Sequence, residues 1–309
     1  MDNLLAQVTC VSDYLSFIEQ LPSSSSPAAD FDDTFVSSVT FFRGQANEAW
    51  GLTPSLFRQG LFDDESLLLQ SIMHCRPDDF EGLDRFYAMA LLQHYGMPTR
   101  LLDLTTNPLV ALFFACSGEM KSNGKVIILP HFPTSWSTDP LIQLVMDFCF
   151  DYHQSQVDLA RMLTDSMDKY GQSVGRLMPT TIDLLIHYLT IPALGVRPKW
   201  TNPRLMAQQG AFLICGMELS DRKKPASGNA SGRYDCRFAP LMDVPIDMIW
   251  KSACSCIVPS GCKEKILNEL HLLGVDSMTL FPDLPHAIET VVNTVKRKSI
   301  TKQGHGRLS

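Results

Sequence analysis

The sequence predicts an α+β fold with one central mixed sheet, surrounding helices and a helical insertion. Short runs of β-branched and aromatic residues alternate with longer stretches whose apolar residues recur at helical spacing. The predicted strands are few, short and separated by helices or long loops, which is typical of helices packed around one sheet. Hydrophobic residues make up 45% of the 309 and charged residues 19%, so the chain can bury a core.

Strands are expected where β-branched and aromatic residues lie between turn residues. The predicted strands are 36–42, 124–130, 210–216 and 255–259. Two further stretches contain prolines, which interrupt regular structure. Residues 51–58 are expected to form a turn or a short extended piece, and residues 191–204 an irregular connection.

Helices are expected where apolar residues recur three or four positions apart. The predicted helices are 11–21, 63–75, 83–93, 139–150, 156–168, 180–190, 261–273 and 285–296. Ser12 is the expected N-cap of the first, because its hydroxyl can accept a hydrogen bond from the first turn. Stretches rich in serine, proline or glycine, at 21–33 and 220–234, are expected to be loops.

The chain shows no internal repeat and no linker between equal halves, so one main domain is expected. Residues 1–35 are predicted to form an N-terminal helix and loop, and residues 36–285 the main domain. Residues 286–309 are predicted to form a C-terminal helix and a basic tail. The helical insertion is expected at about 137–190, inside the main domain.

Charge and hydropathy limit the function classes. The net charge of -7 argues against non-specific nucleic-acid binding, which needs a basic face. The N-terminus lacks the basic region and apolar core of a signal peptide. No apolar run reaches the roughly 18 residues of a membrane span. We therefore expect a soluble, cytoplasmic protein without a membrane or nucleic-acid partner.

Nine cysteines are present, an odd number, and most lie inside apolar runs. They are Cys10, Cys75, Cys116, Cys149, Cys215, Cys236, Cys254, Cys256 and Cys262. Such residues are typical of buried thiols in a reducing compartment. The last three form a cluster, but their spacing does not match a zinc site and no histidine lies at ligand distance. No metal is predicted.

The stretch 91–116 is apolar but contains several polar residues in its middle. Asn107 is a good N-cap, and Pro108 suits the first helical position because its missing N–H would be unpaired there anyway. The following residues are apolar on all sides, so this helix is expected to be buried. Its N-terminus would then favour an anion.

Upstream of that helix, His94 and Tyr95 are expected to end a helix before Gly96. Arg100 and Asp103 fall on opposite faces if the chain is extended there, and can pair if it turns. Taken one by one, these residues can have structural roles. Arg100 and Asp103 can form an ion pair, Thr105 and Asn107 can be caps, and His94 can be a core histidine. Together, so many polar groups in so apolar a segment favour a cleft, because buried polar groups need partners.

Arg43 and Arg204 are further candidates for this cleft. Arg43 directly follows a predicted strand and precedes Gly44, which would let the backbone approach a ligand while the guanidinium binds an anion at two points. A strand-end arginine paired with a carboxylate such as Asp103 is the alternative. Arg204 precedes Gln208 and Gln209, which lie before a buried strand and are otherwise read as edge residues.

Four stretches together resemble the FRG domain family, named for its Phe/Tyr-Arg-Gly motif. They are FFRGQ at 41–45, TPSLFR at 53–58, QHYGMPTRLLDLTTNPLVALFFA at 93–115 and RLMAQQGAF at 204–212. Residues 257–284 resemble the family's C-terminal portion, so the likeness spans about 36–285, with little from 135–195. The family usually has an aromatic residue where this chain has Leu104, so one wall of any pocket differs. Its occurrence in bacteria and phages implies a microbial cytosolic protein, but no settled function.

A more distant likeness is to ADP-ribosyltransferases. Arg43, Thr105 and the pair Gln208 and Gln209 follow the order of the three motifs in those enzymes. The resemblance implies that the arginine holds the phosphates and ribose of NAD. Those enzymes need an acidic residue near the third motif, where this chain has only glutamine. Glu218 lies beyond the strand, so a site here would bind nucleotide without transfer unless Asp103 serves.

We therefore predict a polar cleft that binds a nucleotide or phosphate, with NAD as a candidate substrate in ADP-ribosyl transfer or NAD cleavage. His94 and Asp103 are the catalytic candidates, as an acid or base tuned by burial. The predicted ligand-binding residues are Arg43, Gly44, Gln45, Arg58, Tyr95, Thr99, Arg100, Thr105, Asn107, Arg204, Gln208 and Gln209. The alternative is a non-catalytic binding or sensor module in phage–host conflict, with a protein partner and a structural polar network.

Overall fold

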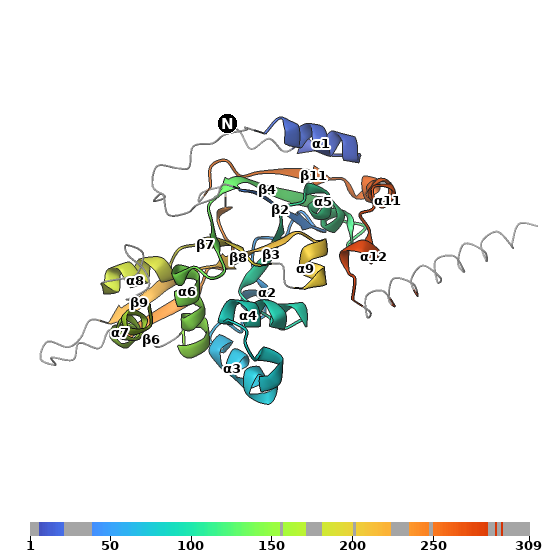
Figure 1. The fold of residues 1–309 in the computed structure, drawn as a ribbon. Coiled ribbons are helices and arrows are strands. Elements are labelled where there is room, and N and C mark those ends of the chain that lie inside the picture. Colours follow the sequence, from blue (N-terminus) through green and yellow to red (C-terminus); the bar gives the residue numbers. More distant parts are fainter. Residues whose placement is uncertain are drawn as a thin grey trace, which may run out of the picture.

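The computed structural model describes residues 6–21, 39–154, 157–170, 181–199, 202–223, 235–246, 250–283, 288 and 292. A mixed eight-stranded sheet in the order β1-β11-β4-β2-β3-β8-β7-β5 forms its centre, with helices around it (Figure 1). The predicted α+β class and central mixed sheet are confirmed. A second sheet, in the order β6-β10-β9, was not predicted.

The strands of the main sheet pair mostly antiparallel, with parallel pairs at its two edges, β1 with β11 and β5 with β7. Its strands are β1 Ala6–Gln7, β2 Val39–Gln45, β3 Leu101–Thr105, β4 Gly124–Phe132, β5 Thr134–Trp136, β7 Ala193–Arg197, β8 Gly210–Cys215 and β11 Cys254–Val258. The small sheet contains β6 Val157–Asp158, β9 Met217–Lys223 and β10 Asp235–Pro240.

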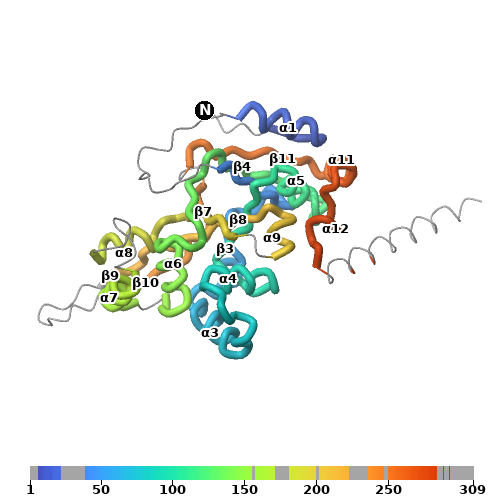
Figure 2. The backbone as a smooth tube through the Cα atoms, in the orientation of Figure 1, coloured from blue at the N-terminus to red at the C-terminus, as the bar shows by residue number. Residues whose placement is uncertain are grey.

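The helices form groups on the two sides of the main sheet (Figure 2). They are α1 Val11–Glu19, α2 Ser55–Arg58, α3 Glu65–Cys75, α4 Arg85–His94, α5 Pro108–Cys116, α6 Pro140–Asp151, α7 Leu159–Tyr170, α8 Ile182–Leu189, α9 Pro203–Ala207, α11 Lys263–Leu272 and α12 Ser277–Leu280, with 3-10 turns at Pro77–Phe80 and Ser260–Cys262. In the described part of the chain, no helix has the length and hydropathy to cross a membrane.

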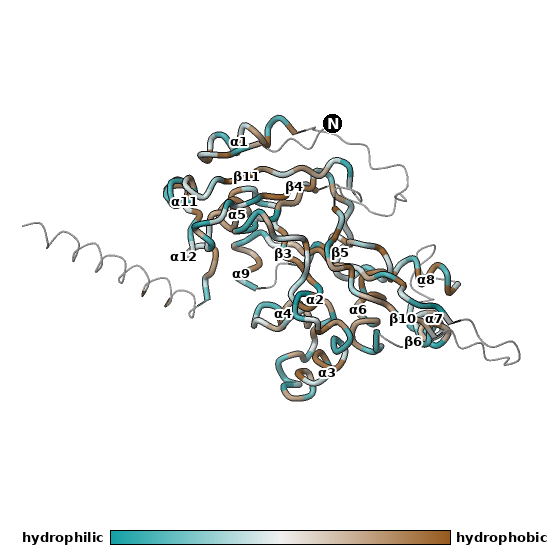
Figure 3. Tube along the Cα trace, turned by 180° about the vertical axis from the view of Figure 1, so that it is seen from behind, coloured by the Kyte–Doolittle hydropathy of each residue, from teal (hydrophilic) through white to brown (hydrophobic). Residues whose placement is uncertain are grey.

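Helix α5 packs directly on the centre of the sheet. A Cβ added to Gly44 on β2 would lie 1.9 Å from the backbone oxygen of Ala111, and one added to Gly124 on β4 would lie 2.1 Å from that of Ala115. Both strands therefore need glycine where the helix crosses them. The helix is apolar almost all round and is drawn mostly brown in Figure 3, as expected for a buried helix.

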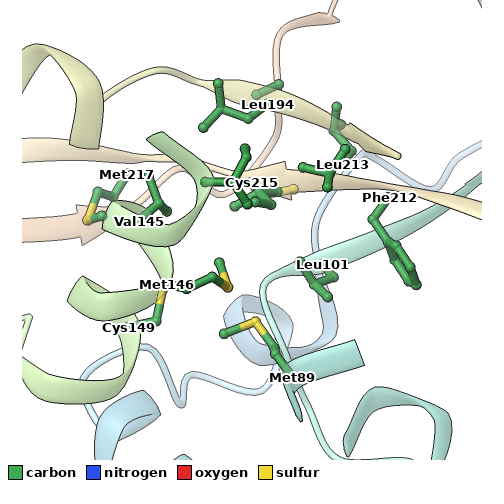
Figure 4. Close-up of a cluster of buried hydrophobic side chains, with 14 of the residues drawn as sticks. Met89, Leu101, Val145, Met146, Cys149, Leu194, Phe212, Leu213, Cys215 and Met217 are labelled. Atoms are coloured by element: carbon green, nitrogen blue, oxygen red, sulfur yellow. The ribbon is translucent and has the colours of Figure 1, made fainter. Parts of the chain in front are cut away.

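Two apolar clusters make up the core. One lies where α1, α5 and α11 cover the sheet, and includes Tyr14 and Phe42. The other joins the opposite side to α3, α4 and α6, and Figure 4 shows part of it around Met89, Leu101 and Met146. Asp103, on β3, belongs to neither cluster and is exposed.

Most of the predicted elements are confirmed. The strands predicted at 124–130, 210–216 and 255–259 match β4, β8 and β11. The seven predicted helices from 11–21 to 261–273 match α1, α3, α4, α6, α7, α8 and α11. β2 covers the described part of the strand predicted at 36–42 and continues through Arg43 to Gln45; residues 36–38 lie outside the described residues. Of the helix predicted at 285–296, only Ile288 and Val292 are described, and both are helical.

Four local predictions are wrong in whole or in part. Residues 51–58 contain the helix α2, and residues 191–204 contain β7 and the start of α9 rather than an irregular connection. β7 forms because β8 and β5 pair with it on both sides, a tertiary effect that local composition does not reveal. The loop predicted at 220–234 begins within β9, and residues 224–234 lie outside the described part. The N-cap of α1 is Cys10, not Ser12.

Candidate functional site

A small pocket lies beside β2 and β3, with a volume of about 190 Å³. Its lining residues come from four elements and their flanks: Phe42, Arg43, Gly44, Asp103, Leu104, Thr105, Phe114, Arg204 and Gln208. We call this the Arg43 pocket. It brings together six of the predicted site residues, from positions far apart in the sequence.

Arg43 is half-buried at this pocket. Its Nη1 donates to the backbone oxygen of Asp103 at 2.6 Å, while its Nε is buried without an acceptor. No carboxylate of the described residues forms an ion pair with it. Burial lowers the pKa of Arg43 below its ordinary value, and the attraction of Asp103 only partly offsets this. The alternative of a side-chain pair with Asp103 is therefore not what the structure contains.

Arg204 brings a second positive charge to the pocket from α9. Its guanidinium lies 4.8 Å from the centre of the Phe281 ring, and it too has no ion pair within the described chain. Gln208 follows this helix, and its Nε2 donates to the backbone oxygen of Leu280 at 3.0 Å. The end of α12 is thus attached beside the pocket, and Phe281, directly after it, packs against the guanidinium of Arg204.

Asp103 supplies the carboxylate of the pocket. Its side chain accepts a hydrogen bond from a residue that was not among the predicted site residues. Gln93 donates from Nε2 to its Oδ1 at 2.7 Å, while the hydroxyl of Thr99 donates to the Oε1 of Gln93. No described residue donates to the other carboxylate oxygen, Oδ2, so this oxygen can face a ligand. Gln93 begins the quoted QHYG stretch, which was the available signal for it.

The start of α5 is capped from within the chain. Asn107 accepts from the N–H of Leu109 at 2.9 Å with Pro108 at the first helical position, as predicted. Thr105 accepts from the N–H of Asn107 at 3.0 Å and donates its hydroxyl proton to the backbone oxygen of Gln208 at 2.6 Å. These bonds already use N–H groups that were expected to bind an anion. Thr105 therefore joins β3, α5 and the Gln208 turn.

Gly44 has a different role from the one expected. The close approach that it permits is to helix α5, and not to a ligand, although its backbone does line the pocket. Leu104, where an aromatic residue was expected for the family, forms part of the wall. Phe42 and Phe114 supply aromatic walls that sequence reasoning did not select.

Arg100 lies away from the pocket, with no exposed surface. Its Nε donates to Oε1 of Glu65 at 2.8 Å, and Gln154 donates to Oε2 of the same carboxylate at 3.0 Å. Because β3 is extended, Arg100 and Asp103 do not pair, which settles the two alternatives left open above. Glu65 shares a helical face with Leu69 and Ile72, so a charge on an apolar face was the signal for it.

Seven other predicted residues do not line the Arg43 pocket: Gln45, Arg58, His94, Tyr95, Thr99, Asn107 and Gln209. Arg58 is exposed and donates to the backbone oxygen of Thr53, and Tyr95, 79% exposed, lines a separate groove between α3 and α4. His94 is half-buried at the end of α4. Gln209 accepts through its backbone oxygen from Thr106.

Within the described residues, no group of three or more histidine, cysteine, aspartate or glutamate side chains is arranged to hold a metal ion.

The comparison with protein families identifies an FRG domain at residues 38–124. The chain therefore contains an FRG domain, and this stretch includes β2, β3 and α5 with Arg43, Asp103 and Thr105. Arg204 and Gln208 reach the pocket from outside the matched residues. No curated protein and no solved structure matches the chain.

Proposed function

We propose that the Arg43 pocket binds the phosphate group of a small molecule, most simply of a nucleotide. The observation behind this proposal is that two guanidinium groups line one small pocket, those of Arg43 and Arg204, and neither has a carboxylate partner among the described residues. Guanidinium donates to phosphate oxygens in pairs, and such charge-assisted bonds are stronger than neutral ones. Arg43 also has a buried donor, Nε, for which the described residues supply no acceptor.

The size of the pocket restricts what enters it. Pockets that enclose a drug-sized ligand have volumes of about 300–1,000 Å³. The Arg43 pocket, at about 190 Å³, suits a phosphate with the adjoining sugar or ring. The rest of a nucleotide would then extend over the surface.

NAD is the candidate substrate in the catalytic form of this proposal. Arg43 and Arg204 would hold its phosphates, and Asp103 would act beside the ribose. In NAD cleavage, water adds to the ribose carbon as the bond to nicotinamide breaks, and the proton released passes to Asp103 and then to solvent. Gln93 would keep the carboxylate in place for that step.

A non-catalytic binding module is the second candidate function. Of the described residues that line the pocket, Asp103 is the only carboxylate. The distant likeness to ADP-ribosyltransferases implies an acid near the third motif, where this chain has Gln208 and Gln209. A module of this kind would bind the nucleotide and pass the signal to a protein partner, as in phage–host conflict.

The test is calorimetric titration with inorganic phosphate, AMP, ADP, ATP and NAD. We expect binding of at least one of them, and a loss of about 10- to 100-fold in Arg43→Gln and Arg204→Gln, since hydrogen bonds to charged groups contribute about 1.5–3 kcal/mol. Arg161→Gln is the matched control, because Arg161 is 76% exposed and remote from this pocket. The side chain of Arg204 has no hydrogen bond to a described residue, so its variant tests the site with little risk of unfolding.

Two results would overturn the proposal: no phosphate compound binds the wild-type chain, or both pocket variants bind as the wild type does. Nicotinamide release from NAD separates the two candidate functions. Turnover that is lost in Asp103→Asn supports the catalytic form, and binding without turnover supports the module.

A further inference from the structure

A second cavity lies on the other side of the β2 terminus, with a volume of about 370 Å³. Its walls are the turn 48–52 that follows β2, the paired segments of β4 and β11 near Lys125 and Ser255, and the residues around Asp243. It shares no lining residue with the Arg43 pocket. We call it the Trp50 cavity.

The turn that forms one wall is fixed by hydrogen bonds. Gln45, which is buried, donates from Nε2 to the backbone oxygen of Gly51 at 3.2 Å. The N–H of Leu52 donates to Oδ1 of Asp243 at 2.8 Å, and Nδ2 of Asn123 donates to Oε1 of Glu48 at 3.0 Å. Hydrogen bonds of the fold therefore fix the walls of the cavity. The carboxylates of Glu48 and Asp243 each accept one of these bonds through one oxygen.

The charged groups of this cavity are not paired with one another. Glu48 and Asp243 each keep a second carboxylate oxygen without a donor among the described residues, and the Lys125 ammonium has no carboxylate within ion-pair distance in that part of the chain. The indole of Trp50 lines the same cavity and is 50% exposed. Two negative charges, one positive charge and a half-exposed aromatic ring thus converge on one space.

We propose that the Trp50 cavity binds a small zwitterion, namely a free amino acid with an apolar or aromatic side chain. Its ammonium would pair with Glu48 and Asp243, its carboxylate with Lys125, and its side chain would pack on Trp50. A simple anion would meet two carboxylates, and a simple amine would leave the lysine unpaired. A neutral sugar would neutralise neither charge. Only a ligand that has both a positive and a negative charge can pair with Glu48, Asp243 and Lys125 together.

The exposed Trp50 provides the measurement. The twenty amino acids are titrated into the full chain while tryptophan emission and the midpoint of thermal unfolding are followed. We expect at least one apolar or aromatic amino acid to change the emission and raise the midpoint, and the emission change to disappear in Trp50→Phe. The N-acetyl and the amide derivatives of that amino acid, which each remove one charge, should bind at least tenfold more weakly.

The variants Glu48→Gln and Lys125→Met should also weaken binding at least tenfold, because each removes one partner charge without removing side-chain volume. Lys121→Met is the matched control, since Lys121 is exposed and does not line the cavity. The proposal fails if no free amino acid binds at millimolar concentration. It also fails if the blocked derivatives bind as well as the parent, or if glucose binds in place of all of them.

Discussion

Arg100 and Glu65 form an ion pair inside the protein, 35 residues apart in the sequence and with exposed side-chain fractions of 0% and 2%. The guanidinium also lies 5.9 Å and 5.7 Å from the ring centres of Phe57 and Phe62. Glu65 is the first residue of α3, and Arg100 directly precedes β3, the strand of Asp103. The pair therefore fastens α3 to the strand that lines the Arg43 pocket.

Removal of one partner of this pair is expected to destabilise the fold strongly. In Arg100→Met, the Glu65 carboxylate stays buried without its cation, and we expect the free energy of unfolding to fall by about 3–5 kcal/mol. Urea denaturation at pH 7 measures this. Addition of Glu65→Leu should recover part of the loss, because a buried pair replaced by apolar residues is often tolerated. A loss below about 1 kcal/mol in the single variant would contradict a structural role for the pair.

Gly44→Ala tests the packing of α5 on β2. The added methyl would lie 1.9 Å from the backbone oxygen of Ala111, so strand and helix must separate. We expect a loss of at least the 1–3 kcal/mol typical of overpacked cores, or failure to fold. Gly261→Ala is the control, because nothing lies within 4 Å of its added Cβ. Equal thermal midpoints for the two variants would show that α5 does not rest on Gly44.

The buried cysteines predict a loss of stability in alkali. Burial raises the pKa of Cys116, Cys215 and Cys256 to about 12 in each case. Because the pKa of each thiol is higher in the folded chain, the thiol loses its proton at a lower pH in the unfolded chain than in the folded one. The stabilisation is complete below the ordinary thiol pKa and is lost as the pH rises from about 9 toward 12. Urea midpoints measured between pH 8 and 11 should fall accordingly.

Thiol titration of the native chain gives an independent check of the same burial. Cys75 is exposed and should react first, whereas Cys116, Cys215 and Cys256 should react only after unfolding. Cys75→Ser should remove the fast phase. A fast phase that persists in this variant, with an amplitude of more than the three thiols of the half-buried Cys10, Cys254 and Cys262, would mean that the buried thiols are accessible.

The parts of the site that could be predicted are those determined by adjacent residues. The cap of α5 by Asn107 with Pro108 depends on local geometry, and the sequence is sufficient to recognise it. The helix end at Gly96 is equally local, and its φ of 90° explains why glycine is there. The alternation of strands and helices follows from hydrophobic spacing in the same way.

What could not be predicted depends on partners distant in the sequence. Arg100 was predicted to bind a ligand, but its guanidinium pairs with Glu65, 35 positions earlier in the chain. The stretch that forms β7 was predicted to be irregular, but it pairs with β8 and β5. Residue type alone also suggested that Gly44 served a ligand, whereas the contact is with α5. Arg43 and Arg204 line the same pocket, but their nearness depends on how β2 and α9 pack, which local spacing does not show.

The hydrogen bond from Gln93 to Asp103 gives a pH-dependent prediction. Gln93→Glu places a second carboxylate where Nε2 now lies 2.7 Å from Oδ1 of Asp103. Two like charges about 4 Å apart repel by about 1 kcal/mol in water and about 4 kcal/mol near a protein surface.

The two carboxylates of the Gln93→Glu variant would therefore keep a shared proton up to a higher pH in the folded chain than in the unfolded one. The variant should therefore be less stable than the wild type at pH 7, with a deficit that shrinks as the pH falls toward about 4, close to the ordinary pKa values of both acids. Gln93→Leu loses the same hydrogen bond without adding charge, so its deficit should change little over that range. Urea denaturation of the three proteins at pH 7, 5.5 and 4 makes the comparison, and parallel deficits for both variants would show that Asp103 is not held by Gln93 in solution.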